Sequence, residues 1–191
     1  LEASSAYNPE YCVFHVSDVS TKSSINHHFD YVDEQIVDAT IELVNCVYTE
    51  ESMGGLLLFE NLWWPGLTML KPHIVQRLLD GVNYPHCGVM LDIGHLMHTN
   101  PNLRSLDEGI EYIYNVLEKH VNHNYIKGIH LHQSLGGEYV QSILKQPFDL
   151  PDSYDERQWK IYKHIMSIDR HQPFLSGDIS SLIEYINPEY L

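Results

Sequence analysis

Three stretches of the chain share one pattern, an apolar run that ends at an acid or a histidine. They are residues 55–61 (GLLLFEN), 88–95 (GVMLDIGH) and 126–132 (IKGIHLH). They recur about every 35 residues, which is the length of one strand–helix unit. Carboxylates and imidazoles are common ligands of divalent metal ions. The pattern therefore predicts a metal site at the ends of neighbouring strands.

Asp92 and His95 are the most informative pair in these stretches. Asp92 ends an apolar run, and His95 lies three residues further on. Gly94 between them would let the backbone turn tightly, which could bring both side chains to one point. The alternative is an aspartate that caps the next helix and a histidine that fills the rim of the fold.

Glu60, His130 and His132 are the other strand-end candidates. Glu60 follows four apolar residues, although a carboxylate in that place can also be a helix cap or an ion-pair partner. His130 and His132 face the same side of a strand because side chains alternate. His15 ends an earlier apolar run and is a weaker case. Other histidines lack this placement and are expected at the surface: His98, His120, His123 and His171.

Two adjacent tryptophans, Trp63 and Trp64, follow Glu60 in a short aromatic loop. Aromatic rings above a strand end can stack on the apolar faces of a sugar, so both are candidate substrate-binding residues, together with His132. The alternative is that at least one of the two indoles packs against the rim.

The elements that must position these residues alternate between strands and helices. Strands are expected over residues 11–16 and 173–176, and before Glu60, Asp92 and His130. Helices are expected over residues 33–47, 72–81, 155–170 and 179–186, and after a capping box at 105–108. Loops are expected over 17–28 and 135–153. The five strand–helix units predict an α/β fold of the β/α-barrel type, whose active site lies at the C-terminal ends of the strands.

Composition limits the classes of function. The chain has 191 residues, 43% of them hydrophobic, and a net charge of −15. It is expected to form a single domain, residues 1–191. The basic residues are not clustered, which speaks against nucleic-acid binding. No run is long enough to cross a membrane and no signal peptide is visible. Three widely spaced cysteines predict free thiols and a cytoplasmic location.

Three strings in the expected order resemble the xylose-isomerase-like TIM-barrel superfamily, which includes endonuclease four and the sugar-phosphate isomerases and epimerases. They are LFEN at 58–61 followed by Gly66, LDIGH at 91–95, and IHLHQS at 129–134. The resemblance covers the chain from about residue 11 and begins at the family's fourth strand. It implies a (β/α)8 barrel of which this chain lacks the first three strand–helix units, with a divalent metal at the mouth.

The resemblance also implies roles for single residues. Glu60, Asp92 and His130 match the family's metal ligands, and His95 matches the histidine that follows the aspartate ligand. His15 matches a metal-binding histidine of the endonuclease branch. The family's eighth-strand glutamate is missing near Ser176, where Asp178 is the candidate replacement. The additional aspartate–histidine pair of the endonuclease branch is not evident after His130.

The expected function is a metal-dependent isomerase or epimerase of a small sugar or sugar derivative, acting by proton transfer through an enediolate. Glu60 would be ligand and base, and His95 would shuttle a proton. Mn²⁺, Zn²⁺, Co²⁺ and Mg²⁺ all suit the site. Two alternatives remain, a non-catalytic metabolite-binding barrel and an endonuclease-four-like phosphodiesterase. The expected partners are the sugar and a completing chain or second copy, with no nucleic acid and no membrane.

Overall fold

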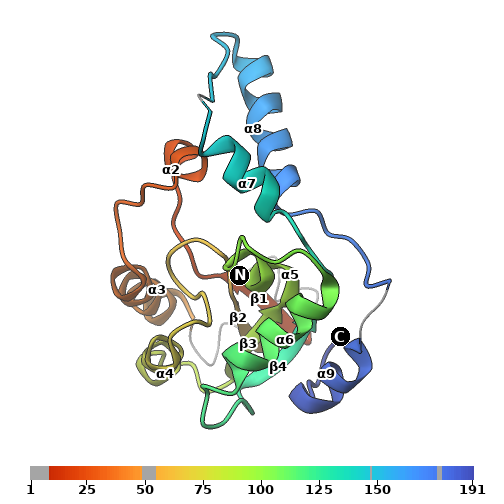
Figure 1. Ribbon diagram of the computed structural model, residues 1–191. Helices are drawn as coiled ribbons and strands as arrows, with labels where there is room; N and C mark the ends of the chain where they lie inside the picture. Colours follow the sequence, from red (N-terminus) through yellow and green to blue (C-terminus); the bar gives the residue numbers. More distant parts are fainter. Residues whose placement is uncertain (1–8, 49–54, 147, 176–177) are drawn as a thin grey trace.

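The computed structural model describes residues 9–48, 55–146, 148–175 and 178–191. Its centre is a parallel sheet with the strand order β1-β2-β3-β4 (Figure 1). The strands are β1 (Tyr11–His15), β2 (Leu56–Glu60), β3 (Cys87–Asp92) and β4 (Ile126–His130). Because sequential parallel strands are neighbours, the sheet has the simple order of a β/α barrel wall, and the predicted α/β fold is confirmed.

The register of the sheet brings the polar strand ends to one edge. His15 pairs with Glu60 between β1 and β2, and Asp92 pairs with His130 between β3 and β4. Glu60 pairs with Met90, two residues before Asp92. Parallel strands all end on the same side, so four candidate ligands lie along one edge by topology alone.

The two faces of the sheet differ in what covers them. Leu57 and Phe59 of β2 join a large apolar core that also contains buried residues of the surrounding helices. Leu58, between them, is equally buried but points to the opposite face. Glu60 lies two residues after Leu58 and therefore points to the same face as Leu58. Asp92 points to the same face as Met90 for the same reason. The two carboxylates therefore belong to the inner face of the curved sheet, at its end.

Helices flank the sheet and also gather at one end of it (Figure 1). The flanking helices are α3 (Asp33–Val47), α4 (Pro72–Gly81), α6 (Leu106–Leu117) and α9 (Ile179–Ile186), and α5 (Ile93–His98) follows β3 directly. The gathered group is α2 (Thr21–Asn26), α7 (Gly137–Ile143) and α8 (Tyr154–Ile168). The bounds predicted for α3, α4 and α9 are confirmed. The predicted capping box is present in part: the Ser105 side chain accepts a hydrogen bond from the Glu108 amide, but the Glu108 carboxylate accepts one from the Arg104 amide rather than from Ser105.

Two segments predicted as loops contain helices. Residues 17–28 include α2, whose first turn is capped by the Ser20 side chain, and residues 135–153 include α7. Both helices are short, with six and seven residues, and neither carries a long apolar stripe. Their periodicity was too brief to be distinguished from a polar loop.

The fifth predicted strand is wrong in the part that the structure describes. Residues 173–175 form no strand, and Ser176 lies outside the described residues. The outer edge of β4 is taken by the C-terminal segment instead. Tyr190 accepts a hydrogen bond from the Ile129 amide, and its own amide donates to Lys127. Because the Ile129 amide and the Lys127 carbonyl are paired with Tyr190, they are not available to hydrogen-bond with residues 173–175.

Two further expectations concern the environment of the chain. All three cysteines are free. Among the described residues, no helix combines the length and the apolar character that crossing a bilayer requires.

Candidate metal centre

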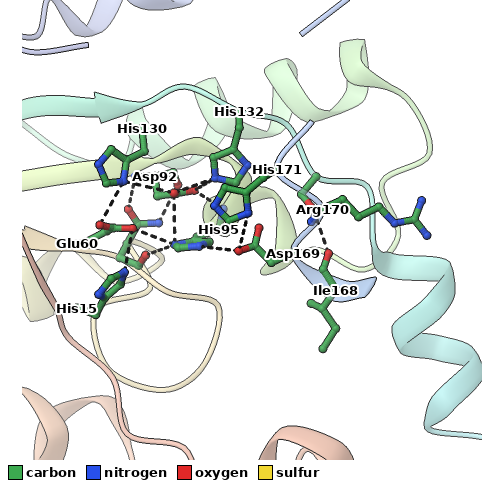
Figure 2. A network of polar contacts seen from close by, with 12 residues as sticks. His15, Glu60, Asp92, His95, His130, His132, Ile168, Asp169, Arg170 and His171 are labelled. Carbon is green, nitrogen blue, oxygen red and sulfur yellow. Dashed lines mark hydrogen bonds and ion pairs between the residues drawn. The ribbon is translucent and has the colours of Figure 1, made fainter. Parts of the chain in front are cut away.

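Glu60 is the carboxylate around which three histidines gather. Its side chain is only 2% exposed. Oε1 lies 3.3 Å from Nε2 of His15 and 3.5 Å from Nδ1 of His95, while Oε2 lies 3.2 Å from Nδ1 of His130. These side chains come from the strands β1, β2 and β4 and from the helix α5 (Figure 2). The sheet edge thus converges on one buried carboxylate, as the strand-end pattern predicts.

Asp92 is the second buried carboxylate and contacts a different set of histidines. It lies 2.9 Å from Nε2 of His132, 3.7 Å from Nδ1 of His130 and 3.6 Å from Nδ1 of His95. Its Oδ1 also accepts a hydrogen bond from the His95 amide and so caps α5. Asp92 therefore combines the role of a helix cap with the placement of a ligand.

Asn61 fixes the geometry between the two carboxylates. Its amide group exchanges two hydrogen bonds with the backbone of Asp92, at 2.8 and 3.0 Å. Its backbone carbonyl lies 2.8 Å from Nδ1 of His95. A carbonyl can only accept, so Nδ1 carries the proton and the opposite nitrogen, Nε2, is left to face the site. This arrangement is typical of histidines that bind metal through one nitrogen.

Asp169 and His171 complete the far side of the site. Oδ2 of Asp169 lies 3.4 Å from Nε2 of His95 and 3.1 Å from Nδ1 of His171. The His171 ring stacks on His132, with centroids 4.1 Å apart and an angle of 8° between planes. His171 was expected at the surface, and its side chain is 53% exposed although it contacts the site; Asp169 was not a candidate. Both follow the end of α8 rather than a strand, so the strand-end criterion missed them.

The donors fall into two clusters that share Asp92. The first cluster is Glu60, Asp92 and His130, and the second cluster is Asp92, His95, His132 and His171. In each, one ligand atom per residue lies within 4.8 Å of the others. Nδ1 of His132 and Oδ1 of Asp169 are buried and make no hydrogen bond, while Oε2 of Glu60 has an ion-pair contact with Nδ1 of His130. Oxygen and imidazole donors with unsatisfied buried atoms fit a divalent cation.

The charges of the site are strongly coupled. Burial acts to raise the pKa of Glu60, but the contacts with His130 and His15 outweigh it and lower that pKa to about 2. Asp92 behaves in the same way, with its pKa lowered by His130 and His132 against the effect of burial. The two carboxylates raise the pKa of His130 to about 10. Two ionised carboxylates thus share buried space with positive charge, which is the balance that a bound cation would also provide.

A profile of the xylose isomerase-like TIM barrel matches residues 26–187. The chain belongs to that family. No curated protein sequence matches it. The match spans β2, β3 and β4, which carry Glu60, Asp92 and His130, and it begins after His15. The TIM-barrel fold expected from the three strings is therefore confirmed, and the described residues contribute four of its parallel strands.

An aspartate and a histidine outside the strands, Asp169 and His171, also lie beside the site. An aspartate–histidine pair was not evident in the sequence after His130. The structure brings Asp169 and His171 to His95 from a position 74 residues beyond it. The segment between β4 and this pair contains α7 and α8, and folding back of that helical pair closes the distance.

Asp178 is placed away from both clusters. Its carboxylate accepts a hydrogen bond from the Ser181 amide and caps α9. It lines a surface hollow together with Glu111 and Tyr114 of α6, on the helical side of the sheet. Asp169, rather than Asp178, is the further carboxylate that the structure adds to the site.

The two tryptophans differ in environment. Trp64 is buried, whereas Trp63 is partly exposed. The centroid of the Trp63 ring lies 5.0 Å from that of the His95 ring and 5.1 Å from that of the His98 ring. Trp63 thus borders the second cluster and stays a candidate for substrate contact. Trp64 packs against Trp63, with the two ring centroids 4.4 Å apart. Neither indole N–H has a hydrogen-bond partner.

Gly94 is required by the His132 ring rather than by the turn. A Cβ at position 94 would lie 2.1 Å from Cε1 of His132. We expect Gly94→Ala to push His132 off Asp92 and to weaken metal binding about tenfold or more, as loss of a ligand's supporting contact does. A competition titration with a chromophoric chelator measures this.

Gly109→Ala is the matched control for that substitution. Its Cβ would meet Cε of Met97 at 2.6 Å, which is the movable end of a flexible side chain. Metal affinity should therefore stay at the wild-type value in Gly109→Ala. Equal affinities of Gly94→Ala and the wild type would contradict the assigned role of Gly94.

His98 gives a prediction about acid stability. Burial lowers its pKa from 6.5 to about 4, and its Nε2 has no hydrogen-bond partner. The unfolded chain takes up the proton below about pH 6.5, whereas the folded chain resists it until about pH 4. As pH falls through this window, the titration of His98 should therefore lower the free energy of unfolding by about 3 kcal/mol in total.

The variant His98→Gln removes this titration. In urea unfolding at pH 7 and pH 4.5, we expect the wild type to lose more stability on acidification than His98→Gln does. The other buried groups titrate in both proteins and cancel in the comparison. Parallel pH dependences of the two proteins would exclude the assignment.

Proposed function

We propose that this TIM-barrel chain is a divalent-metal-dependent isomerase or epimerase of a small sugar or sugar derivative. The observation that carries the proposal is the convergence of two buried carboxylates, Glu60 and Asp92, with His130 at the end of the parallel sheet. Active sites of barrel enzymes occupy this end. Family membership supports the proposal, because sugar isomerases and epimerases are members of the superfamily that the chain resembles.

The first cluster, Glu60, Asp92 and His130, would hold the metal ion. His15, which lies next to Glu60, would be a further ligand. When bound, a divalent cation polarises a carbonyl and a neighbouring hydroxyl and so lowers the cost of an enediolate. Mn²⁺, Zn²⁺, Co²⁺ and Mg²⁺ are compatible with this donor set. The chain's own residues must move the proton.

Two carboxylates on opposite sides of the His95 ring are suited to proton transfer. Glu60 lies 3.5 Å from Nδ1 and Asp169 lies 3.4 Å from Nε2. In the proposed reaction, Glu60 accepts the proton from the carbon beside the carbonyl. The Nδ1–H of His95 is held by the Asn61 carbonyl, so His95 exchanges a proton through Nε2 with Asp169. Asp169 supplies the second carboxylate that epimerisation requires, in place of the missing eighth-strand glutamate.

Trp63 and His132 border this space and are the proposed substrate contacts. Trp63 offers a ring face and an unpartnered N–H. His132 offers an unpartnered Nδ1. A sugar hydroxyl can both donate and accept, so it can satisfy such groups while its apolar face stacks on the indole.

Solvent exchange tests the proposed chemistry without a known substrate. The protein, loaded with Mn²⁺, Zn²⁺, Co²⁺ or Mg²⁺, is incubated in D₂O with a panel of aldoses, ketoses and their phosphates. NMR then follows deuterium at the carbon beside the carbonyl. We expect exchange for at least one sugar. Metal binding without any exchange would favour the alternative of a non-catalytic, metabolite-binding barrel.

Phosphodiester hydrolysis is the second candidate function. It is favoured by Asp169 and His171 beside His95, because the endonuclease branch of the superfamily has such an aspartate–histidine pair at a third metal position. The net charge of −15 disfavours DNA as the substrate. A gel shift and a cleavage assay with abasic DNA at low salt, and cleavage of a small phosphodiester, distinguish the two functions.

The free edge of β1 suggests a partner. Among the described residues no strand pairs with the outer edge of β1, and a hollow of about 490 Å³ lies between it and α3. We propose that further strands, from a completing chain or a second copy, cover this edge. Native mass spectrometry of the purified protein should show an assembly larger than one chain, in keeping with the proposed cytoplasmic, soluble enzyme.

A further inference from the structure

Ser134 connects the strand side of the site to the segment that bears Asp169 and His171. It follows His132 by two residues, and its side chain is 1% exposed. The hydroxyl donates a hydrogen bond to the Ile168 carbonyl at 3.0 Å and accepts one from the Arg170 amide at 2.9 Å. These two groups flank Asp169 on both sides, so one hydroxyl holds both neighbours of that residue.

Gln133 adds a second attachment between the same segments. Its backbone forms an antiparallel bridge with Gln172, with hydrogen bonds of 2.7 and 3.1 Å. The two side-chain amides also meet at 3.1 Å. The segment 168–172 is therefore attached to the loop after β4 on both sides of His171.

His171 has a backbone conformation that needs such support. Its φ angle is +45°, in the left-handed region, which costs a non-glycine residue about 1–2 kcal/mol. That conformation lets its ring stack on His132 while Nδ1 contacts Asp169. A strained residue persists where the surroundings fix it, and such residues are concentrated at functional sites.

We propose that Ser134 is a positioning residue, which sets Asp169 and His171 against His95 by hydrogen bonding to both peptide groups around Asp169. The inference deepens the proposed function, on which its metal-binding consequences rest. Alanine at position 134 removes the donor and the acceptor together. Threonine keeps both, and is the conservative variant that should restore the arrangement.

The first test uses the metal-free protein and needs no activity. The stacked rings of His132 and His171 shield each other, so their ring resonances in ¹H–¹³C NMR spectra report the arrangement. We expect these resonances to move toward unstacked positions in Ser134→Ala and to return in Ser134→Thr. Ser167→Ala is the matched control, because its hydroxyl interacts with the Lys163 carbonyl and with Tyr139 rather than with the segment 168–172. Unchanged rings in Ser134→Ala would overturn the inference.

The second test measures metal binding. In a Zn²⁺ competition titration we expect Ser134→Ala to weaken the site that includes Asp169 and His171 by about 10–100-fold, the usual effect of losing a ligand's supporting hydrogen bonds. The first cluster should keep its affinity. Because Ser134 acts partly through Asp169, Ser134→Ala should have a smaller effect in an Asp169→Asn background than in the wild type. Wild-type affinity in Ser134→Ala, or additive losses, would overturn the inference.

The two tests separate this inference from the proposed function. If the wild type binds none of the four metals, the proposed function fails, while the NMR comparison still decides the role of Ser134. If the wild type binds metal and the histidine rings are insensitive to Ser134→Ala, the positioning role alone fails.

Discussion

Asp92→Asn should abolish high-affinity metal binding at both clusters, because Asp92 is their shared member. The exchange removes one buried negative charge that faces His130 and His132. Loss of a direct charged ligand should exceed the roughly 10–100-fold effect of losing an outer hydrogen bond. Isothermal titration with Zn²⁺ and Mn²⁺ measures it, and deuterium exchange into a sugar substrate should disappear in parallel.

The fold should survive this substitution. Asn is as good a helix cap as Asp, so it can still accept the hydrogen bond from the His95 amide that begins α5. Asp178→Asn is the matched control, since Asp178 caps α9 in the same way but lies away from both clusters. Undiminished metal binding by a folded Asp92→Asn protein would refute the two-cluster arrangement. Loss of metal from Asp178→Asn would restore Asp178 as a ligand.

Glu60→Gln should eliminate turnover and weaken metal retention. Glu60 is the proposed base, and general-base residues typically contribute about 10²–10⁴-fold to rate. Gln has nearly the same shape but neither the charge nor the ability to take up a proton. The loss should therefore appear in kcat as well as in metal affinity. Steady-state kinetics with the sugar identified by solvent exchange, at saturating metal, separates the two effects.

Glu42→Gln is the control for this variant, because Glu42 is an exposed residue of α3. It should keep wild-type turnover and metal affinity. Full activity of Glu60→Gln would exclude the base assignment. Retained metal with lost turnover would assign Glu60 to proton transfer alone and leave the metal to Asp92 and His130.

The strand-end ligands could be predicted because they depend on local order. An apolar run that ends at Glu60 or Asp92 places that carboxylate at the C-terminal end of a buried strand, and parallel topology does the rest. The helices α3, α4 and α9 were predictable for a similar reason. Each presents a regular apolar stripe or a cap within its own sequence.

Several features depended on contacts that no local pattern encodes. Trp64 is buried and Trp63 partly exposed, although the two are adjacent and identical. Gly94 suggested a tight turn, whereas its role is to leave room for the His132 ring. The segment after residue 172 looked like a strand, but Tyr190 pairs with the edge of β4. Each outcome is set by which distant segment packs against the position.

The sequence alone thus determined the fold family and the first cluster, since strand order and strand-end chemistry are written in consecutive residues. Only the tertiary structure showed that Asp169 and His171 lie at the site. Asp169 and His171 follow a helix, not a strand, and reach His95 because Ser134 and Gln133 bind the chain on its return from α8. Hydrogen bonds between segments so far apart leave no periodic signal, and that is why these two residues became visible at the site only in three dimensions.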